Sequence, residues 1–387
     1  MAQHTLPFSR AEYLDRLSRT RAAMETAGVE LLLVSSPENI LWLTGYQAKG
    51  IFAFQILMVP LAGEVRLVTR GIETGNIRCM PDEAVIDDFQ TYGDTAPPVS
   101  TAAALIGASY PAARRLGVEK TNPSLGVGRF EALAAALDGH TFLDAGHLVD
   151  RVRLVKSPAE IDCFRRAAAI TDAAMTDTIA AVKPGVEDRE IAAVSLASLV
   201  RHGSDYCSTW PNVMVGWRGG LAHAAWDGTK VKEGEPVPLE FAASVERYHS
   251  PSFRTVIPGK PKEEIARAAG CLVEAHDAGL AVIAPGRTVG EVDAAIRAVV
   301  TEAGCARYAH SRFGYSIGLS FPPTWAQSMS VDIVPGSPAA FEENMLFHIL
   351  LYLLEPAEFG VATSQTVLVT ASGIEVLTKS PKAPVYI

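Results

Sequence analysis

The feature that most constrains the fold is a pattern that occurs twice in the second half of the chain. Residues 160–193 and 263–295 each have the pattern of a long helix, a Pro-Gly turn and a second helix with an N-terminal capping signal. Two copies are too few for a solenoid. Strand-like segments follow each copy. The repeat therefore predicts a pseudo-symmetric α/β domain, with a functional site where its two halves meet.

The first part of the chain reads as a separate α/β layer domain. Residues 9–28 form an amphipathic helical pattern that begins at a Ser and ends at a Gly, and "VELLLVSS" (29–36) and "EVRLVTRG" (64–71) are typical of buried strands. A length of 387 residues favours two domains. We place the boundary before the Ser-Pro that opens the next long helix, which gives domains at 1–154 and 155–387.

Charge and composition exclude several classes of protein. The net charge of -9 argues against a nucleic-acid surface, and the longest nearly apolar run, residues 345–354, is too short to span a bilayer. Residues 1–17 carry charges where a signal peptide needs an apolar core. The five cysteines include no C-x-x-C pair. We therefore expect a cytoplasmic protein with reduced thiols, bound neither to membranes nor to nucleic acid.

The order of these signals resembles the creatinase, prolidase and aminopeptidase P superfamily. The resemblance covers the whole chain and is strongest in "NILWLTGY" (39–46), "RVRLVKSPAEI" (151–161), "RFGYSIGLSFPP" (312–323) and "TVLVTASGIEVLT" (366–378). It implies a mixed α/β fold, with a creatinase-like N-terminal domain followed by a pseudo-symmetric pita-bread domain. It also implies a homodimer, in which the N-terminal domain of one subunit often caps the site of its partner.

The metallopeptidases of this superfamily hold two metal ions with Asp, Asp, His, Glu and Glu side chains. The resemblance places these five ligand positions at Glu240, Pro251, Tyr315, Leu350 and Ser364. One acid therefore remains at five positions, whereas a two-metal centre needs several carboxylate or imidazole ligands on each ion. The chain resembles the metal-independent branch, and we expect neither a metal nor another cofactor.

Within that branch the strongest resemblance is to the ectoine hydrolases, which add water to a cyclic amidine and produce an acetylated diaminobutyrate. It rests on "LPFSRAEY" (6–13), "AHAAWD" (222–227) and "LEFAASVERYHSP" (239–251). A creatinase would carry an acid at the position of Phe253. The function predicted is metal-independent hydrolysis of a C–N bond, other than a peptide bond, in a small amidine or guanidino substrate. The segment 46–55 departs from the ectoine-hydrolase pattern, so the reaction class is better defined than the substrate.

Two residues are the first candidates for catalysis. Glu240 has apolar neighbours on both sides, which favours a buried acid, acting as a general base or as a nucleophile, over a solvent-facing strand end. In this superfamily a His on the loop containing "GLAHAAWDG" (220–228) lies over the substrate. The resemblance therefore implies that His223 is a proton shuttle, because imidazole titrates near neutral pH.

Strand alternation adds two histidines. Side chains two apart on a strand share a face. Since Leu350 occupies a ligand position, His348 is expected to point into the site as a third catalytic residue, provided that the segment is a strand. The same rule places His249 on the face of Pro251, as a substrate-binding candidate. For both histidines the alternative is a core residue satisfied by the backbone.

Four further residues are candidates for substrate binding. Tyr315 stands where the metal-dependent members have a His ligand, and its hydroxyl can bind substrate or an oxyanion. Asp227 can orient His223, although an Asp before Gly more often caps a turn. Arg254 can hold a substrate carboxylate or the fold. Trp226, like the other tryptophans nearby, can form an aromatic wall for a small cation, but core packing is the usual role of Trp.

Two rival functions remain open from the sequence. "GYSIG" (314–318) fits the G-x-S-x-G nucleophile elbow of serine hydrolases, with Asp332 and His348 following in the right order. The elbow must run from a strand into a helix, and the prolines at 322–323 oppose a helix there. The other rival is a catalytically inactive member of the superfamily that only binds a small molecule, since a fold does not determine a function.

Overall fold

The computed structural model describes residues 5–47, 53–327 and 331–387. The chain forms two compact units, of which one ends at Arg153 and the other begins at Leu154. The boundary expected from the sequence lies one residue further along. Within the described ranges, no helix combines the length and the apolar character needed to cross a membrane.

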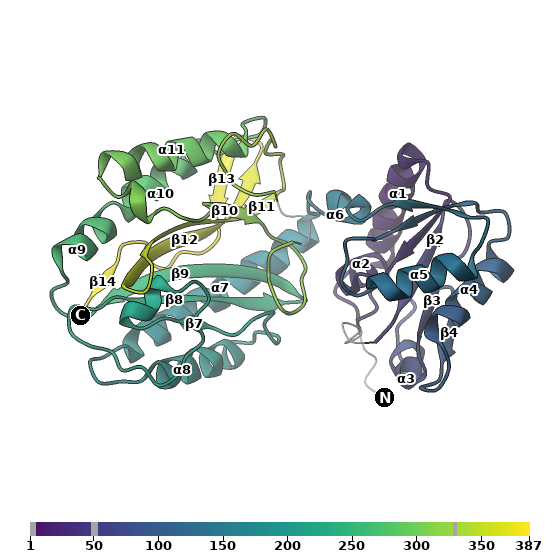
Figure 1. Ribbon diagram of the computed structural model, residues 1–387, viewed down its shortest axis with the longest axis horizontal. Helices are drawn as coiled ribbons and strands as arrows, with labels where there is room; N and C mark the ends of the chain where they lie inside the picture. Colours follow the sequence, from purple (N-terminus) through teal and green to yellow (C-terminus); the bar gives the residue numbers. More distant parts are fainter. Residues whose placement is uncertain (1–4, 48–52, 328–330) are drawn as a thin grey trace. The chain divides into compact units, whose positions relative to one another are not determined.

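The N-terminal unit is built on a six-stranded mixed sheet with the strand order β4-β3-β2-β1-β5-β6 (Figure 1). The strands are β1 (Leu31–Val34), β2 (Ile56–Pro60), β3 (Arg66–Arg70), β4 (Asp88–Tyr92), β5 (Arg115–Val118) and β6 (Thr141–Asp144). The helices are α1 (Arg10–Ala27), α2 (Pro37–Thr44), η1 (Gly71–Glu73), α3 (Thr74–Arg78), α4 (Pro98–Ser109), α5 (Val127–Ala136) and α6 (Leu148–Val152). Strand β2 runs antiparallel to both of its neighbours, and the other pairs are parallel.

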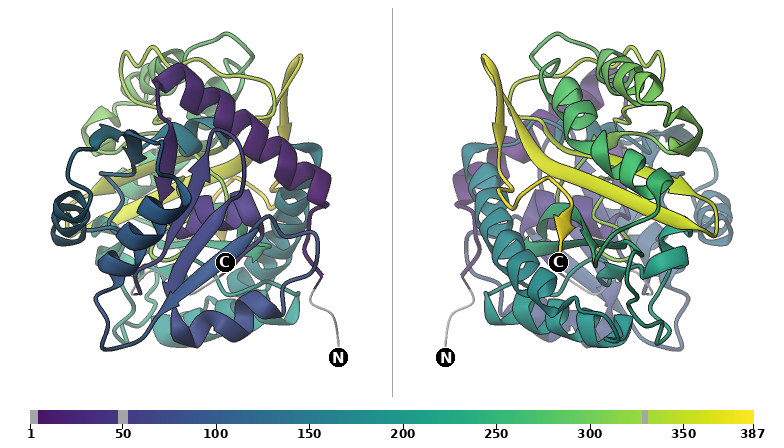
Figure 2. Two further views of the ribbon diagram at one scale, coloured as in Figure 1. Left: turned by 90° about the vertical axis from the view of Figure 1, so that its right-hand side faces the viewer. Right: turned by 90° about the vertical axis from the view of Figure 1, so that its left-hand side faces the viewer.

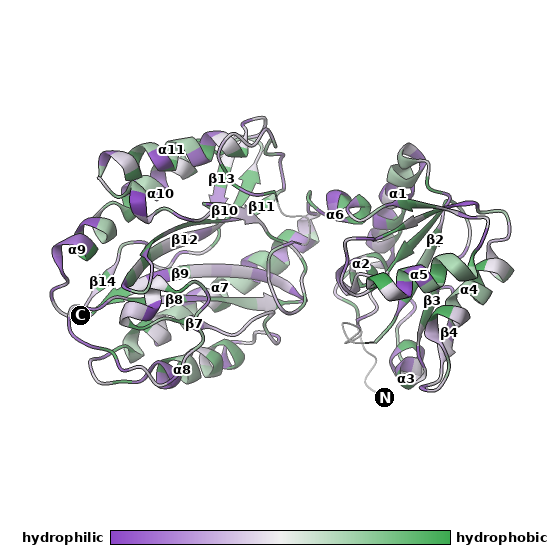
Figure 3. Ribbon diagram, viewed as in Figure 1, coloured by the Kyte–Doolittle hydropathy of each residue, from purple (hydrophilic) through white to green (hydrophobic). Residues whose placement is uncertain are grey.

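Local signals explain where the first helix begins and ends. The Ser9 hydroxyl accepts a hydrogen bond from the backbone N–H of Glu12, which satisfies one of the free donors of the first turn. Gly28 ends the helix with a φ of 68°, a left-handed conformation that glycine adopts without strain. Apolar side chains of α4 and α5, such as Ile106 and Leu133, pack with Leu31 of β1 in one core. Figure 3 shows hydrophobic residues concentrated on the strands of this sheet.

The C-terminal unit contains two four-stranded sheets, with the orders β10-β11-β12-β13 and β14-β9-β8-β7. The strands are β7 (Asn212–Val213), β8 (Val237–Val245), β9 (Tyr248–Ile257), β10 (Gly314–Ser316), β11 (Leu346–Glu355), β12 (Phe359–Thr370), β13 (Gly373–Val376) and β14 (Val385–Tyr386). The helices are α7 (Pro158–Ala181), α8 (Asp188–Arg201), η2 (Gly216–Gly220), α9 (Glu263–Gly270), α10 (Leu272–Leu280), α11 (Val289–Glu302) and η3 (Ala306–Tyr308).

The sequence repeat becomes two sets of helices, each packed on its own sheet. Helix α7 packs against β8, β9 and α8, whereas α10 packs against β11 and β12 and α9 packs against β12. The right-hand view of Figure 2 shows the second set crossing the long strand β12. The two copies differ in their first helix, which is interrupted at Cys271 in the second copy. Gly270, a poor helix former, stands at the break, and the Cys271 thiol is hydrogen-bonded to the carbonyl of Ala268.

Buried side chains join the two sheets where β9 and β12 lie next to each other. The Thr255 hydroxyl donates to the Ala362 carbonyl and accepts from the Ala362 N–H, and the Thr366 hydroxyl donates to the Pro251 carbonyl. These bonds satisfy polar backbone groups of β9 and β12, which belong to different sheets and are not paired with each other. The cavity described below is lined by residues from both sheets, so this junction positions the site.

Candidate active site

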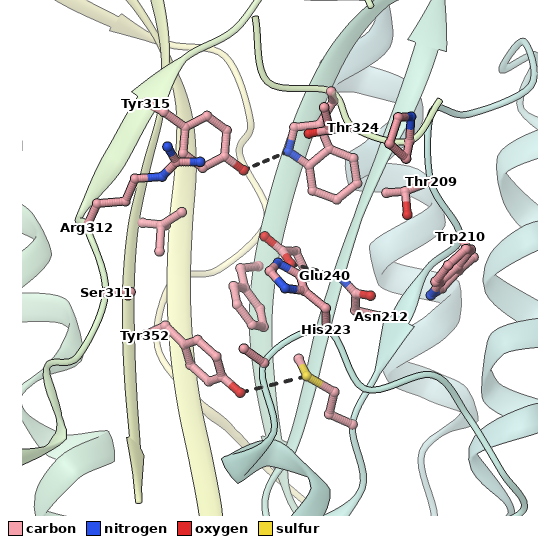
Figure 4. Close-up of a pocket in the computed structure, with 16 residues that line it drawn as sticks. Thr209, Trp210, Asn212, His223, Glu240, Ser311, Arg312, Tyr315, Thr324 and Tyr352 are labelled. Atoms are coloured by element: carbon pink, nitrogen blue, oxygen red, sulfur yellow. Dashed lines mark hydrogen bonds between the residues drawn. The ribbon is translucent and has the colours of Figure 1, made fainter. Parts of the chain in front are cut away.

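A cavity of about 430 Å³ lies between the two sheets of the C-terminal unit (Figure 4). Its volume falls within the range usual for small-molecule sites. Its walls consist mainly of aromatic and apolar side chains. The lining residues are Thr209, Trp210, Asn212, Met214, Ala222, His223, Glu240, Phe253, Ser311, Arg312, Tyr315, Pro323, Thr324, Trp325, Leu350 and Tyr352. Three of the predicted site residues, Glu240, His223 and Tyr315, line this cavity together.

Glu240 is the buried acid of the cavity. It lies on β8 between Asn212 of β7 and Phe253 of β9, so these three side chains form one row across the sheet. The Asn212 amide donates a hydrogen bond of 3.0 Å to Oε2 of Glu240, and no partner for Oε1 is found among the described residues. Burial raises the pKa of Glu240 to about 7, and the Asn212 bond offsets only part of this effect. The carboxyl group therefore exchanges protons near neutral pH.

His223 reaches the cavity on a loop that glycines hold against the second sheet. A side chain on Gly219 would collide with the backbone of Gly360, and one on Gly220 would collide with the carbonyl of Glu355. The Tyr352 hydroxyl also donates to the Gly219 carbonyl. Beyond this anchored turn, His223 itself has a φ of 60°, a strained value for a residue with a side chain. The strain is typical of a residue whose position serves a site.

Tyr315 and His348 form a pair on the opposite wall. They face each other across β10 and β11, and the Tyr315 hydroxyl lies 3.1 Å from Nδ1 of His348. Nε2 of His348 lies 2.7 Å from the Ser364 hydroxyl. His348 is fully buried and is not among the residues that line the cavity, whereas its hydrogen-bond partner Tyr315 lines it. Alternation places His348 on the side of the sheet that faces the cavity, and His348 is connected to the cavity wall through its bond to Tyr315.

Two of the predicted binding residues have structural partners instead of a place in the cavity. His249 is fully buried, and its ring nitrogens are hydrogen-bonded to Ser208, Ser320 and the Arg247 carbonyl. Arg254 donates to three backbone carbonyls and is also fully buried. Both side chains hold strands and loops together. The contacts of His249 and Arg254 are therefore those of the structural role that the sequence analysis gave as the alternative to substrate binding.

Asp227 and Trp226 also lie outside the cavity lining. Asp227 is exposed, makes a 2.7 Å ion pair with Arg218 and accepts from the backbone and hydroxyl of Thr229. These are the contacts of a turn-capping residue, so Asp227 does not orient His223. Trp226 is half-buried and packs against the core under β7 and β8. The aromatic wall is supplied by other side chains.

Several lining residues were not predicted. Tyr352 follows Leu350 on the same face of β11, so the alternation that indicated His348 also indicates Tyr352. Asn212 belongs to a two-residue strand, which leaves no periodic signal. Arg312 precedes β10, pairs with Asp332 at 2.7 Å and lies 4.3 Å above the Tyr315 ring. No pattern in the sequence separates it from other surface arginines.

The donor set does not fit a two-metal centre. Of the five ligand positions that the resemblance implies, Pro251 and Leu350 have no donor atom in their side chains, and the Ser364 hydroxyl is engaged by His348 and by the Phe253 N–H. Over the described ranges, no group of three or more His, Cys, Asp or Glu side chains is arranged to hold a metal. Glu240 is left as a single carboxylate, which is not enough for two ions.

The nucleophile elbow does not form. Ser316 is fully buried in β10, and its hydroxyl accepts from the Val331 N–H. Asp332 pairs with Arg312, while His348 bonds to Tyr315, so the three residues do not form a relay. The described residues directly after Ser316, 317–327, contain no helix either.

Residues 48–52 of the segment 46–55 lie outside the described residues. The consequence for the substrate of this segment's departure from the ectoine-hydrolase pattern stays a prediction.

Known proteins similar to this chain agree on its domains. Residues 162–371 match the profile of metallopeptidase family M24, and residues 16–155 match the creatinase/prolidase N-terminal domain. The ectoine hydrolase of Halomonas elongata is 30% identical over 99% of this chain and 99% of its own length. A probable dipeptidase PepE of Mycobacterium tuberculosis is 27% identical, covering 95% of this chain and 94% of its own length.

Solved structures support the same fold. The dipeptidase PepE from Mycobacterium ulcerans superposes with a TM-score of 0.83 at 26% identity, over 98% of this chain and 99% of that chain. A prolidase from Thermococcus sibiricus superposes with a TM-score of 0.87 at 22% identity, over 97% and 99%, which bears on the fold alone. The predicted architecture, a creatinase-like N-terminal domain followed by a pita-bread domain, is confirmed. The chain belongs to metallopeptidase family M24 and is a hydrolase of that family.

Proposed function

We propose that the protein is a metal-independent hydrolase that opens the cyclic amidine of a small, carboxylate-bearing substrate, as an ectoine hydrolase does. The observation that carries this proposal is the buried carboxylate of Glu240 in an aromatic cavity, while the other four ligand positions hold no carboxylate or imidazole. A buried carboxylate attracts a cation strongly, because little water screens it. An amidinium is a planar cation of the size that such a cavity accepts.

The charges of the cavity suit a zwitterion. Glu240 can pair with the amidinium, and the rings of Trp210, Trp325 and Tyr352 offer faces for a cation. Arg312 is the cationic lining side chain, and its guanidinium can add a substrate carboxylate to its existing pair with Asp332. Ectoine carries both groups, since its ring-opened product is an amino acid derivative. This match favours a small zwitterionic substrate.

The reaction has a balanced route with Glu240 as a general base. Glu240 takes a proton from water, and the water oxygen bonds to the amidine carbon to form a tetrahedral centre. The proton is returned to one nitrogen, the bond between that nitrogen and the carbon breaks, and the oxygen becomes an amide carbonyl. The hydroxyl proton ends on the freed amine, which keeps the positive charge. We assign the transfer of these protons to His223, which lines the same cavity.

A second route uses Glu240 as the nucleophile. Its oxygen bonds to the amidine carbon as the C=N double bond becomes single, and one ring C–N bond then breaks as its nitrogen takes the proton of the other nitrogen. Water adds to the same carbon, the bond to the Glu240 oxygen breaks and restores the carboxylate, and the proton released goes to the freed amine. Intact-protein mass spectrometry during a single turnover separates the routes, because only the second adds the mass of the substrate to the protein.

Proton NMR of ectoine, hydroxyectoine and creatine incubated with chelator-treated protein tests the proposal. We expect the ring signals of ectoine to be replaced by those of an acetylated diaminobutyrate. Turnover of creatine instead would assign the protein to the creatinase-like alternative, against which Phe253 stands. Binding of ectoine without turnover, with or without added Mn²⁺ or Zn²⁺, would indicate the inactive, ligand-binding alternative. Activity that requires added metal would overturn the metal-independent mechanism.

A further inference from the structure

Four hydrogen bonds connect the cavity wall to the interior of the C-terminal unit. The indole N–H of Trp325 donates to the Tyr315 hydroxyl at 2.8 Å, the bond dashed beside Tyr315 in Figure 4. The same hydroxyl lies 3.1 Å from Nδ1 of His348, and Nε2 of that ring lies 2.7 Å from the Ser364 hydroxyl. The backbone N–H of Phe253 donates to the Ser364 oxygen at 2.7 Å. All four side chains are buried.

Counting donors and acceptors along these four hydrogen bonds selects one tautomer of His348. The ring is neutral, since burial lowers the pKa of His348 to about 3, so one nitrogen donates and the other accepts. The Ser364 oxygen already accepts from the Phe253 N–H. Its own proton needs an acceptor, and among the described residues the one in reach is Nε2 of His348. Nδ1 therefore carries the ring proton and donates it to the Tyr315 oxygen.

The Tyr315 oxygen then accepts two hydrogen bonds, from Trp325 and from His348. Because Trp325 and His348 donate to the oxygen from the protein side, the O–H of Tyr315 itself points towards the cavity that the residue lines. Burial, with the nearby charge of Glu240, holds the pKa of Tyr315 far above its usual value, which keeps this proton in place at any working pH. The result is a single fixed hydrogen-bond donor on the wall of the cavity.

We propose that Tyr315 is a dedicated hydrogen-bond donor for the transition state, and that Ser364 and His348 are positioning residues that aim its proton. The identity of the acceptor rests on the function proposed above. An amidinium offers only N–H donors, so it gains nothing from the Tyr315 proton in the ground state. The tetrahedral centre carries an oxygen, which can accept it. A contact made only after water has added raises kcat without improving substrate binding.

The first test needs no substrate. In ¹⁵N NMR of histidine-labelled protein, with the His348 signals identified by their loss in a His348→Gln variant, we expect a protonated Nδ1 and an unprotonated Nε2. A protonated Nε2, or a doubly protonated ring, overturns the proposal, because Nδ1 could not then be the donor that fixes Tyr315. This readout is independent of whether ectoine is the substrate.

The second test uses variants of Tyr315 and Ser364, the two hydroxyl-bearing residues that His348 connects by hydrogen bonds. Tyr315→Phe removes the donor, and we expect kcat to fall roughly 10²–10³-fold with KM nearly unchanged. Ser364→Ala removes the group that sets the tautomer, and we expect a smaller loss of kcat together with an altered ring ¹⁵N pattern, both restored by Ser364→Thr. A rise in KM without a loss of kcat in Tyr315→Phe would show a ground-state contact and contradict the assignment.

A matched control lies on the same strand. Thr366, two residues beyond Ser364 on β12, is also buried and loses its hydrogen bond to the Pro251 carbonyl in Thr366→Val. This variant removes a buried hydroxyl without touching the chain of bonds to Tyr315. We expect it to leave the His348 tautomer unchanged. If it alters the ¹⁵N pattern as Ser364→Ala does, packing rather than the Ser364 hydrogen bond sets the tautomer, and the role of Ser364 is refuted.

Discussion

Replacing Glu240 by Gln is expected to remove activity and, at alkaline pH, to stabilise the protein. The Gln side chain has the size of the Glu side chain, and its carbonyl oxygen can still accept the hydrogen bond from the Asn212 amide. The substitution removes the group that acts as base or nucleophile in the proposed reaction, so kcat should fall by roughly 10²–10⁴-fold. For the wild type, kcat/KM should rise with pH through about 7, since the carboxylate is the active form.

The stability effect follows from the direction of the pKa shift. The pKa of Glu240 is about 7 in the folded protein and 4.5 ordinarily, so below pH 4.5 the group is protonated in both states and costs nothing. Between pH 4.5 and about 7 the unfolded chain releases this proton while the folded protein keeps it, so the wild type loses up to about 3 kcal/mol of its free energy of unfolding over that range, and the loss is complete above pH 7. This figure is an upper bound, because the carboxylate faces a cavity that water can enter. Glu240→Gln does not suffer this loss.

Urea unfolding at pH 4 and pH 8.5 measures the difference directly. We expect Glu240→Gln to match the wild type at pH 4 and to exceed it by as much as about 3 kcal/mol at pH 8.5. Glu302→Gln, a change of an exposed acid at the end of α11, is the control and should show no such dependence on pH. Equal stabilities of Glu240→Gln and wild type at both pH values would refute the buried ionisation, and retained turnover would refute the catalytic assignment.

Three further substitutions test the division between the cavity and the scaffold. Arg312→Gln should raise KM for ectoine by about 10–100-fold with a smaller change in kcat, because a charge-assisted bond to the substrate carboxylate is lost; an unchanged KM would exclude that contact. Asp227→Asn should leave steady-state kcat and KM within about twofold of wild type, since Asp227 caps an exposed turn; a large loss would restore its predicted role in binding. Ser157→Ala breaks the capping box at the start of α7 and should lower the urea-derived free energy of unfolding by about 1 kcal/mol without altering kcat; no loss of stability would contradict the cap.

Alternation along a strand succeeded for one histidine and failed for another. On β11 it predicted the face of His348 correctly, because Leu350 and Tyr352 on that face line the cavity. On β9 the same rule placed His249 beside the site, yet the cavity lining on that strand is Phe253, whose ring packs on Tyr352 with centroids 5.2 Å apart. A period of two tells which side of a sheet a residue faces. It does not tell how far along the strand a cavity extends.

Other parts of the site were beyond any local pattern. Asn212 comes from a two-residue strand and Arg312 from a loop, and neither belongs to an element long enough to show a period. The interruption of the second repeat at Cys271 was likewise missed. A glycine in an otherwise helical pattern lowers helix propensity by only about 1 kcal/mol, and packing decides whether the helix continues.

The sequence by itself determined the features that depend on neighbours in the chain. These are the caps at Ser9 and Ser157, the two helical repeats, the strands that carry Glu240 and His348, and the missing metal donors. The tertiary structure decided which side chains meet. The proton affinity of Glu240 depends on burial, and the direction of the Tyr315 proton depends on groups brought from separate elements. Burial and hydrogen bonding between distant segments exist only once the two sheets have packed together, so no local pattern encodes them.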